Sequence, residues 1–208
     1  MLLVDVSGSR NFGTLSQMKR DMMAEVAATL AFSTIANNDK VGVIFFSDKI
    51  EKYIPAQKGK THVLHIIREL LSFEPSSKGT DMAQALQYFA NAQKRHCTAF
   101  LISDFIGAGA VDKPLLIASN RHEVNAIQIY DRREAELPNI GLVKFHDAES
   151  DKDLWIDTSL ATVRDDYAQA WKQNQDLLEQ LFTRTGVNHI SVRTDEDYVK
   201  ALMHLFRC

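Results

Sequence analysis

Short apolar runs alternate along the chain with longer segments in which apolar residues recur every three or four positions. The first pattern is typical of strands buried on both faces, and the second of amphipathic helices. The apolar runs predict core strands at 2–6, 41–46, 98–103, 124–130 and 187–192. The helical spacing predicts helices at 14–36, 62–71, 113–119, 161–184 and 196–206, and one more that Thr80 caps. This alternation predicts a mostly parallel sheet with helices on both faces.

Two hairpins are predicted beside this parallel pattern. Residues 49–54 alternate enough to pair with the second core strand, and Pro55 is expected to end the hairpin because proline donates no ladder hydrogen bond. Apolar residues on either side of an acidic turn predict a β-hairpin at about 142–157. The chain shows no linker, repeat or low-complexity tract. We therefore predict a single doubly wound (Rossmann-like) α/β domain over residues 1–208.

Composition narrows the class of protein. The 208 residues are 45% hydrophobic and 25% charged, which is typical of a soluble globular domain, and a net charge of -3 argues against a nucleic-acid partner. The two cysteines, Cys97 and Cys208, do not make a disulfide framework, which favours a cytoplasmic setting. No apolar run approaches the ~20 residues that cross a bilayer, so we expect no membrane contact from this chain. Because the chain opens directly on its central strand, we expect it to be a fragment of a longer protein.

Oxygen-bearing side chains gather at the ends of the predicted strands. They are Asp5, Ser7 and Ser9 in VDVSGS, Thr80 in KGTDM, and Asp104 in LISDF. In an open parallel sheet, ligands bind at the carboxyl ends of the strands where the strand order reverses. If the first and third core strands are neighbours, Asp5 and Asp104 converge there. Two carboxylates and three hydroxyls suit a hard cation such as Mg²⁺ or Mn²⁺ and suit zinc poorly.

The segments LLVDVSGS, DKVGVIFFSD, GTDMAQAL and LISDF together resemble the bacterial branch of the von Willebrand factor type A fold known as domain-of-unknown-function family 58. The resemblance continues through YDRREAELP, VKFHDAESDKDLWIDT and the final helices, so it covers nearly the whole chain. It implies a metal-ion-dependent adhesion site in which Ser7, Ser9 and Thr80 are direct ligands. Asp5 and Asp104 would then act mainly through water and orient the hydroxyls.

This resemblance implies a Mg²⁺-dependent protein-binding module and not an enzyme. An open coordination position on the metal would attract a carboxylate from a partner protein. Members of the family are often encoded beside MoxR-type AAA+ ATPases, so the implied role is as partner or adaptor of such an ATPase or of its client. Members also often carry an upstream segment, sometimes with membrane helices, which would attach the full-length protein to the cytoplasmic face of the membrane. Partner contacts are expected from loops of the rim, at Arg10, Asn11, Phe12, Lys78 and Asp131.

Two other functions stay open at this point. A metal-dependent hydrolase could use the same rim with Asp131 or Glu134 as general base, although no second carboxylate cluster or nearby histidine supports it. A degenerate scaffold that binds no metal is the third possibility. A phosphatase of the haloacid dehalogenase type needs a carboxylate two residues after its nucleophile, and Ser7 stands there. Any one of the three loops that carry the oxygen-bearing side chains would, taken alone, more often be a simple strand-to-helix connection. Three such loops in order favour a metal site.

Overall fold

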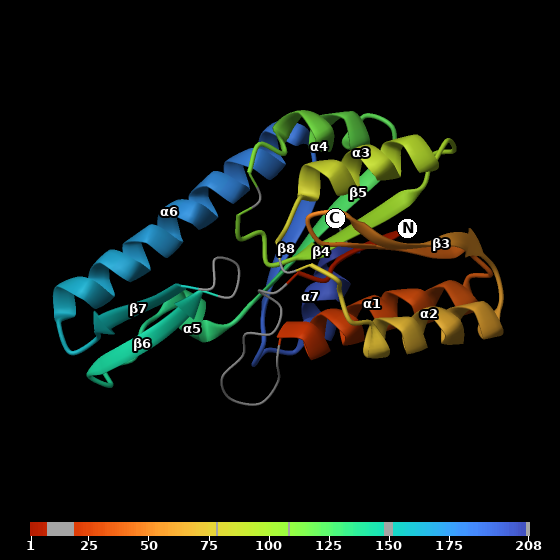
Figure 1. Cartoon of the computed structure of the whole chain (residues 1–208). Helices are drawn as coiled ribbons and strands as arrows, with labels where there is room; N and C mark the ends of the chain where they lie inside the picture. The colour runs from red at the N-terminus through yellow and green to blue at the C-terminus, as the bar shows by residue number, and fades with distance from the viewer. Residues whose placement is uncertain (8–18, 78, 108, 148–151, 207–208) are drawn as a thin grey trace.

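The computed structural model describes residues 1–7, 19–77, 79–107, 109–147 and 152–206. Its strands in the main sheet are β1 (Leu2–Asp5), β2 (Val41–Phe46), β3 (Ile50–Gln57), β4 (Thr98–Ser103), β5 (Glu123–Tyr130) and β8 (Asn188–Arg193). They form a six-stranded sheet in the order β3-β2-β1-β4-β5-β8 (Figure 1). Neighbouring strands are parallel except for the antiparallel β2–β3 pair at one edge. The predicted doubly wound, mostly parallel α/β fold is confirmed.

Helices cover both faces of this sheet (Figure 1). One face packs against α1 (Lys19–Ala36), α2 (Lys60–Ser72) and α7 (Tyr198–Leu205), and the other against α3 (Met82–Ala92), α4 (Asp112–Ser119) and α6 (Ala161–Thr185). Successive strand residues alternate between these two apolar layers. Val43 and Phe45 of β2 belong to the first layer, and Ile44 and Phe46 to the second. Strands covered on both faces are continuously apolar for this reason.

The position of β1 determines where a ligand can bind. β1 lies between β2 and β4, and both pairings are parallel. The chain passes from β1 through α1 to β2 on one side, whereas β4 and β5 extend the sheet on the other. The carboxyl ends of β1 and β4 are therefore adjacent where the winding direction reverses, which is the usual binding position in open α/β sheets.

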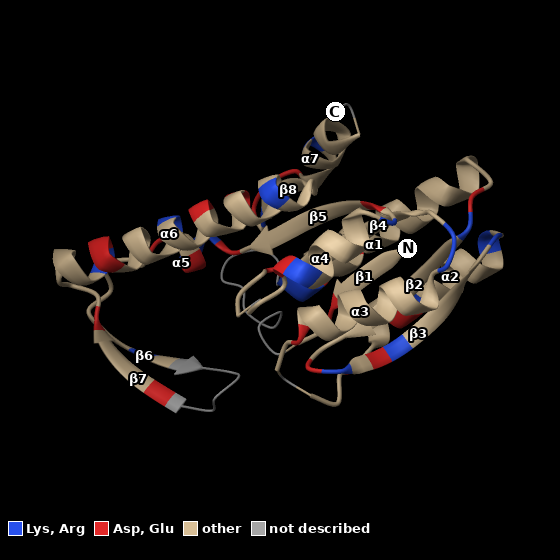
Figure 2. Cartoon of the chain, turned by 90° about the horizontal axis from the view of Figure 1, so that it is seen from above, with Lys and Arg blue, Asp and Glu red and all other residues tan. Residues whose placement is uncertain are grey.

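A second, smaller sheet lies apart from the first. Strands β6 (Leu142–Asp147) and β7 (Lys152–Asp157) form the predicted antiparallel hairpin. Together with the amino-terminal half of α6, this hairpin forms an arm that projects from the main sheet (Figures 1 and 2). Within the described ranges, no helix is both long and apolar enough to span a bilayer.

Some predicted boundaries are wrong. Strand β3 continues past Pro55 to Gln57, because β3 is an edge strand and a shift in the β2–β3 register lies beside the proline. Asp81, and not Thr80, is the N-cap of α3, since its carboxylate accepts a hydrogen bond from the Gln84 backbone N–H. The short helix α5 (Arg132–Ala135) was not predicted. Residues 14–18 of the predicted first helix lie outside the described residues.

Candidate metal site at the carboxyl edge of the sheet

Asp5 and Asp104 meet at the carboxyl ends of the two central strands. Asp5 is the last residue of β1, and Asp104 directly follows β4; both are buried. Neighbouring backbone and side-chain donors orient the Asp5 carboxylate. Its Oδ1 accepts a hydrogen bond of 2.9 Å from the Ser7 backbone N–H, and its Oδ2 accepts one of 2.7 Å from Ser103 Oγ. The predicted pairing of the two strands thus brings both carboxylates to one place.

Burial, and then the negative charge of Asp104, raise the pKa of Asp5 to about 6. The hydrogen bonds from Ser7 and Ser103 act in the opposite direction without offsetting these effects. Two carboxylates held close together away from water favour either a bound proton or a nearby cation. Perturbed acids of this kind gather at functional sites more often than elsewhere.

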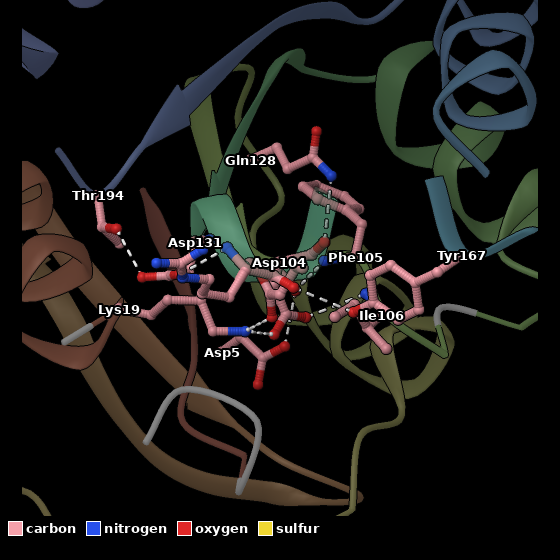
Figure 3. Close-up of polar contacts among 12 residues, drawn as sticks. Asp5, Lys19, Asp104, Phe105, Ile106, Gln128, Asp131, Tyr167 and Thr194 are labelled. Atoms are coloured by element: carbon pink, nitrogen blue, oxygen red, sulfur yellow. Dashed lines mark hydrogen bonds and ion pairs between the residues drawn. The ribbon is translucent and has the colours of Figure 1, made fainter. Parts of the chain in front are cut away.

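A buried lysine supplies positive charge at this position (Figure 3). Lys19 Nζ lies 2.6 Å from Asp104 Oδ2 and 2.5 Å from Glu134 Oε1. Its side chain is fully buried. Burial alone would lower the pKa of Lys19, but the charges of Asp104 and Glu134 outweigh burial and raise it. The lysine is therefore a charged ammonium between two carboxylates.

Lys19 was not predicted to belong to the site. A signal was nonetheless present, because Lys19 precedes Met22 by three residues and Val26 by seven. Those spacings place a lysine on the buried face of an amphipathic helix. A lysine at such a position needs a carboxylate partner inside the fold. The partners themselves come from β4 and α5, and no local pattern identifies them.

Asp131 and Glu134 cap the amino terminus of the short helix α5. Asp131 Oδ1 accepts a hydrogen bond from the Arg133 backbone N–H, and Asp131 Oδ2 accepts one from Thr194 Oγ1. Glu134 Oε2 in turn accepts a hydrogen bond from the Asp131 backbone N–H, which completes a capping box. Asp131, predicted as a partner contact on a loop, is instead a buried N-cap. Burial raises the pKa of Glu134, and the Lys19 charge acts against this rise.

The predicted hydroxyl ligands are described only in part. Ser7, two residues after Asp5, is fully buried, and Thr80 is half-buried. The loop of Thr80 reaches the same edge of the sheet, since the backbone N–H of Asp81 donates to the Ser47 carbonyl just beyond β2. Ser9 lies outside the described residues, as do the predicted rim residues Arg10, Asn11, Phe12 and Lys78.

The described residues fit a hard cation held largely through water. In the described part of the chain, no three His, Cys, Asp or Glu side chains are grouped to hold an ion, so a site here needs hydroxyl ligands. Asp104 Oδ1 accepts from the Ile106 backbone N–H at 3.0 Å, and Asp104 Oδ2 is paired with Lys19. A carboxylate oxygen can accept more than one hydrogen bond. Asp5 and Asp104 can therefore still accept hydrogen bonds from metal-bound water while neighbouring groups fix their orientation.

The fold and this edge define a doubly wound α/β domain with a candidate cation site where its central strands end. The family model described as "Protein of unknown function DUF58" matches residues 1–177, and the chain belongs to this family. The predicted membership of domain-of-unknown-function family 58 is thereby confirmed.

Relatives of the chain are found in mycobacteria. An uncharacterized protein of Mycobacterium tuberculosis is 32% identical over 202 residues, which cover 95% of this chain and 63% of that protein. An uncharacterized protein of Mycobacterium avium is 30% identical over 158 residues, which cover 74% of this chain and 92% of that protein. The chain thus spans less than two thirds of the length of the M. tuberculosis relative.

Two solved structures resemble the whole chain at low sequence identity. The conserved hypothetical protein BatB from Bacteroides thetaiotaomicron has a TM-score of 0.62 at 16% identity, over 99% of this chain and 95% of that one. An aerotolerance-related membrane protein from Bacteroides fragilis has a TM-score of 0.66 at 16% identity, over 100% and 98% of the two chains. These likenesses establish the fold alone.

Proposed function

We propose that this domain is a Mg²⁺-dependent protein-binding module of the von Willebrand A type. The observation that carries the proposal is the burial of Asp5 beside Asp104 at the reversal point of the sheet, where the pKa of Asp5 is raised to about 6. Keeping two acids together in the interior is unfavourable for the fold alone. The Lys19 ammonium compensates Asp104 in part, and a divalent cation bound beside the two acids would offset the remaining cost.

In this proposal Ser7, Ser9 and Thr80 are the direct ligands of the metal. Asp5 and Asp104 hold its water ligands and orient the hydroxyls. The bound metal supplies a Lewis-acidic position that accepts one further oxygen ligand. Because hydroxyl ligands are neutral, a carboxylate from a partner protein is the ligand that best completes the site.

The hydrogen bonds and ion pair made by Asp131 and Glu134 support a binding function over hydrolysis. A hydrolase at this edge would need a general base that can reach a substrate or water. Asp131 caps α5 by accepting from the Arg133 backbone N–H and also accepts from Thr194 Oγ1, and Glu134 is paired with the Lys19 ammonium. Both candidate bases therefore hold the fold together, which favours a module that coordinates over one that turns a substrate over.

Calorimetric titration with Mg²⁺ and Mn²⁺ tests the first step. Wild-type protein should bind one ion and gain thermal stability, whereas Ser7→Ala, Thr80→Ala and Asp104→Asn should bind it at least about tenfold more weakly. Ser159→Ala removes a hydroxyl that bonds Asp157 at the end of β7, and it serves as the matched control. Absence of both binding heat and thermal stabilisation in wild type at millimolar metal would overturn the proposal.

The partner is proposed from the family resemblance and the charge of the site. We propose a protein that offers an aspartate or glutamate, with a MoxR-type AAA+ ATPase or its client as the first candidate, and a cytoplasmic location for the encounter. Affinity capture with Mg²⁺ should retain a protein that chelator releases. Replacing the responsible carboxylate of that protein by its amide should abolish capture. Retention that is unchanged by chelator would contradict a metal-mediated contact.

A further inference from the structure

Lys19 is a buried charge to which the proposed coordination gives no role. Its ammonium joins three segments that are distant in sequence: the start of α1, the end of β4 and helix α5 (Figure 3). The contact to Asp104 Oδ2 spans 85 residues of sequence, and the contact to Glu134 Oε1 spans 115. Burying an ammonium requires strong compensation from its partners.

The formal charges around Lys19 match the charge of a divalent ion. Among the described residues around Lys19, the carboxylates of Asp5, Asp104 and Glu134 carry three formal negative charges and Lys19 carries one positive charge, which leaves -2. A divalent ion makes this group neutral. Without the lysine the charge would be -3, which suits a trivalent ion. Asp131 lies outside this count, because its carboxylate accepts hydrogen bonds from the Arg133 backbone N–H and from Thr194 Oγ1.

We propose that Lys19 is a resident cation that sets the metal affinity and charge selectivity of this site. This rests on the proposed metal-binding function and adds a determinant of it. The ammonium repels an incoming ion, so it holds the affinity below that of the carboxylates alone. Because charges in the protein interior are weakly screened by water, the repulsion is strong for an ion held beside Asp104, which contacts the ammonium. The repulsion grows with the charge of the ion, so trivalent ions are disfavoured more than divalent ones.

A purely positioning role predicts the opposite sign. If Lys19 served only to orient Asp104, its removal would release that carboxylate and weaken metal binding. If Lys19 acts as a resident cation, its removal strengthens binding. The direction of a single affinity change therefore separates the two roles.

The test is a charge cycle of four proteins: wild type, Lys19→Met, Glu134→Gln and the double variant. Mg²⁺ affinity is measured by calorimetry and Tb³⁺ affinity by luminescence. Lys19→Met should bind Mg²⁺ at least about tenfold more tightly. The logarithm of its gain in affinity for Tb³⁺ should be about one and a half times as large as that for Mg²⁺, in proportion to ion charge. Glu134→Gln should bind both ions more weakly. The double variant, whose net charge equals that of wild type, should return to within about threefold of it.

Loss of the lysine can also weaken the fold, because it leaves Asp104 and Glu134 without their partner. Circular dichroism in chelator shows which variants are folded. Lys19→Arg keeps the charge and should retain wild-type affinity for both ions. The double variant and Glu134→Gln keep the cycle informative if Lys19→Met does not fold, since the first should match wild type and the second should bind more weakly.

The outcomes separate this inference from the proposed function. Weaker Mg²⁺ binding by Lys19→Met and by the double variant would overturn the resident-cation role while the function stands. If wild type binds no metal and Lys19→Met does, the lysine itself takes the place of the ion, so the inference stands and the function fails. Absence of binding in every folded variant would overturn both.

Discussion

The Ser103 hydroxyl donates a hydrogen bond of 2.7 Å to Asp5 Oδ2, joining the last residues of β4 and β1 inside the protein. Ser103 Oγ also accepts a hydrogen bond of 3.0 Å from the Phe105 backbone N–H. The serine thereby connects the Asp5 carboxylate to the turn that carries Asp104. The sheet itself, and not only the surrounding loops, fixes the orientation of the first acid of the site.

Ser103→Ala is the first prediction. The change leaves Asp5 with one donor fewer and the Phe105 N–H without its acceptor. We expect the free energy of unfolding to fall by about 1–3 kcal/mol. The loss should be larger at pH 8 than at pH 4, because the ionised form of Asp5 depends most on the donor. Urea denaturation at both pH values, in chelator, measures it.

A matched control for this variant is Ser33→Ala, which removes a hydroxyl bonded to the Leu30 carbonyl within α1. Its effect should not depend on pH. If Ser103→Ala showed the same pH-independent loss as this control, the serine would not act through the Asp5 charge.

Asp5→Asn is the second prediction, and it concerns metal-free protein. The pKa of Asp5 is raised from 3.8 to about 6 in the fold, so between these values the folded state holds a proton that the unfolded state has lost. The free energy of unfolding must then decrease as pH rises through this window. At about 1.4 kcal/mol per pKa unit, the decrease amounts to about 3 kcal/mol. The asparagine variant lacks it and should be more stable than wild type at pH 7.5 by up to that amount.

The advantage of Asp5→Asn should disappear below pH 4, where Asp5 is protonated in both states. Millimolar Mg²⁺ should stabilise wild type and leave the variant unchanged. Denaturation curves from pH 3.5 to 8 with chelator or Mg²⁺ measure both effects, with the exposed Asp176→Asn as control. A wild-type stability that rises between pH 4 and 6 relative to Asp5→Asn would contradict the raised pKa.

The sequence pattern predicted the parts of the site that depend on parallel-sheet geometry. Asp5 ends one apolar strand and Asp104 directly follows another, and parallel strands bring their carboxyl ends to one edge. Lys19 and Glu134 were not placed, because their contact depends on how α1 and α5 pack over the ends of the strands. The periodicity of apolar residues within each helix contains no information on how two helices pack against each other. A buried lysine can be recognised from its helix face, but its partner cannot.

Local capping was also only partly predictable. Thr80 and Asp81 are adjacent residues that can both cap a helix, and the structure uses the aspartate. The choice leaves Thr80 at the rim, and it depends on the hydrogen bond that fixes Asp81 N–H to the Ser47 carbonyl.

The effect of Pro55 was likewise not predictable from the local sequence. Its effect on a strand depends on whether that strand lies at an edge, which is a property of the whole sheet.

Gly42→Ala is the third prediction, and it concerns the β2–β3 edge. A Cβ atom at Gly42 would lie 2.7 Å from both the Ala56 backbone nitrogen and the Ile54 carbonyl oxygen. Backbone atoms cannot move aside as a flexible side chain can, so we expect a loss of about 1–3 kcal/mol in the free energy of unfolding. Gly79→Ala is the control, since its nearest contact would be an ordinary 3.5 Å to Asp48 Cβ. Equal stability of the two variants in urea would contradict the close approach.

Tyr167→Phe tests how the arm is attached to the site. The Tyr167 hydroxyl on α6 donates to the Arg133 carbonyl of α5 at 3.2 Å, next to the residue that holds Lys19. Its removal should lower the free energy of unfolding by about 0.5–1.5 kcal/mol. Hydrogen exchange should accelerate in α5 and the amino-terminal half of α6, and not in β1 or β4. Tyr198→Phe is the control, because its hydroxyl contacts Thr29 Oγ1 on the other side of the sheet. Faster exchange throughout the central strands would show that the hydroxyl supports the whole fold and not the arm.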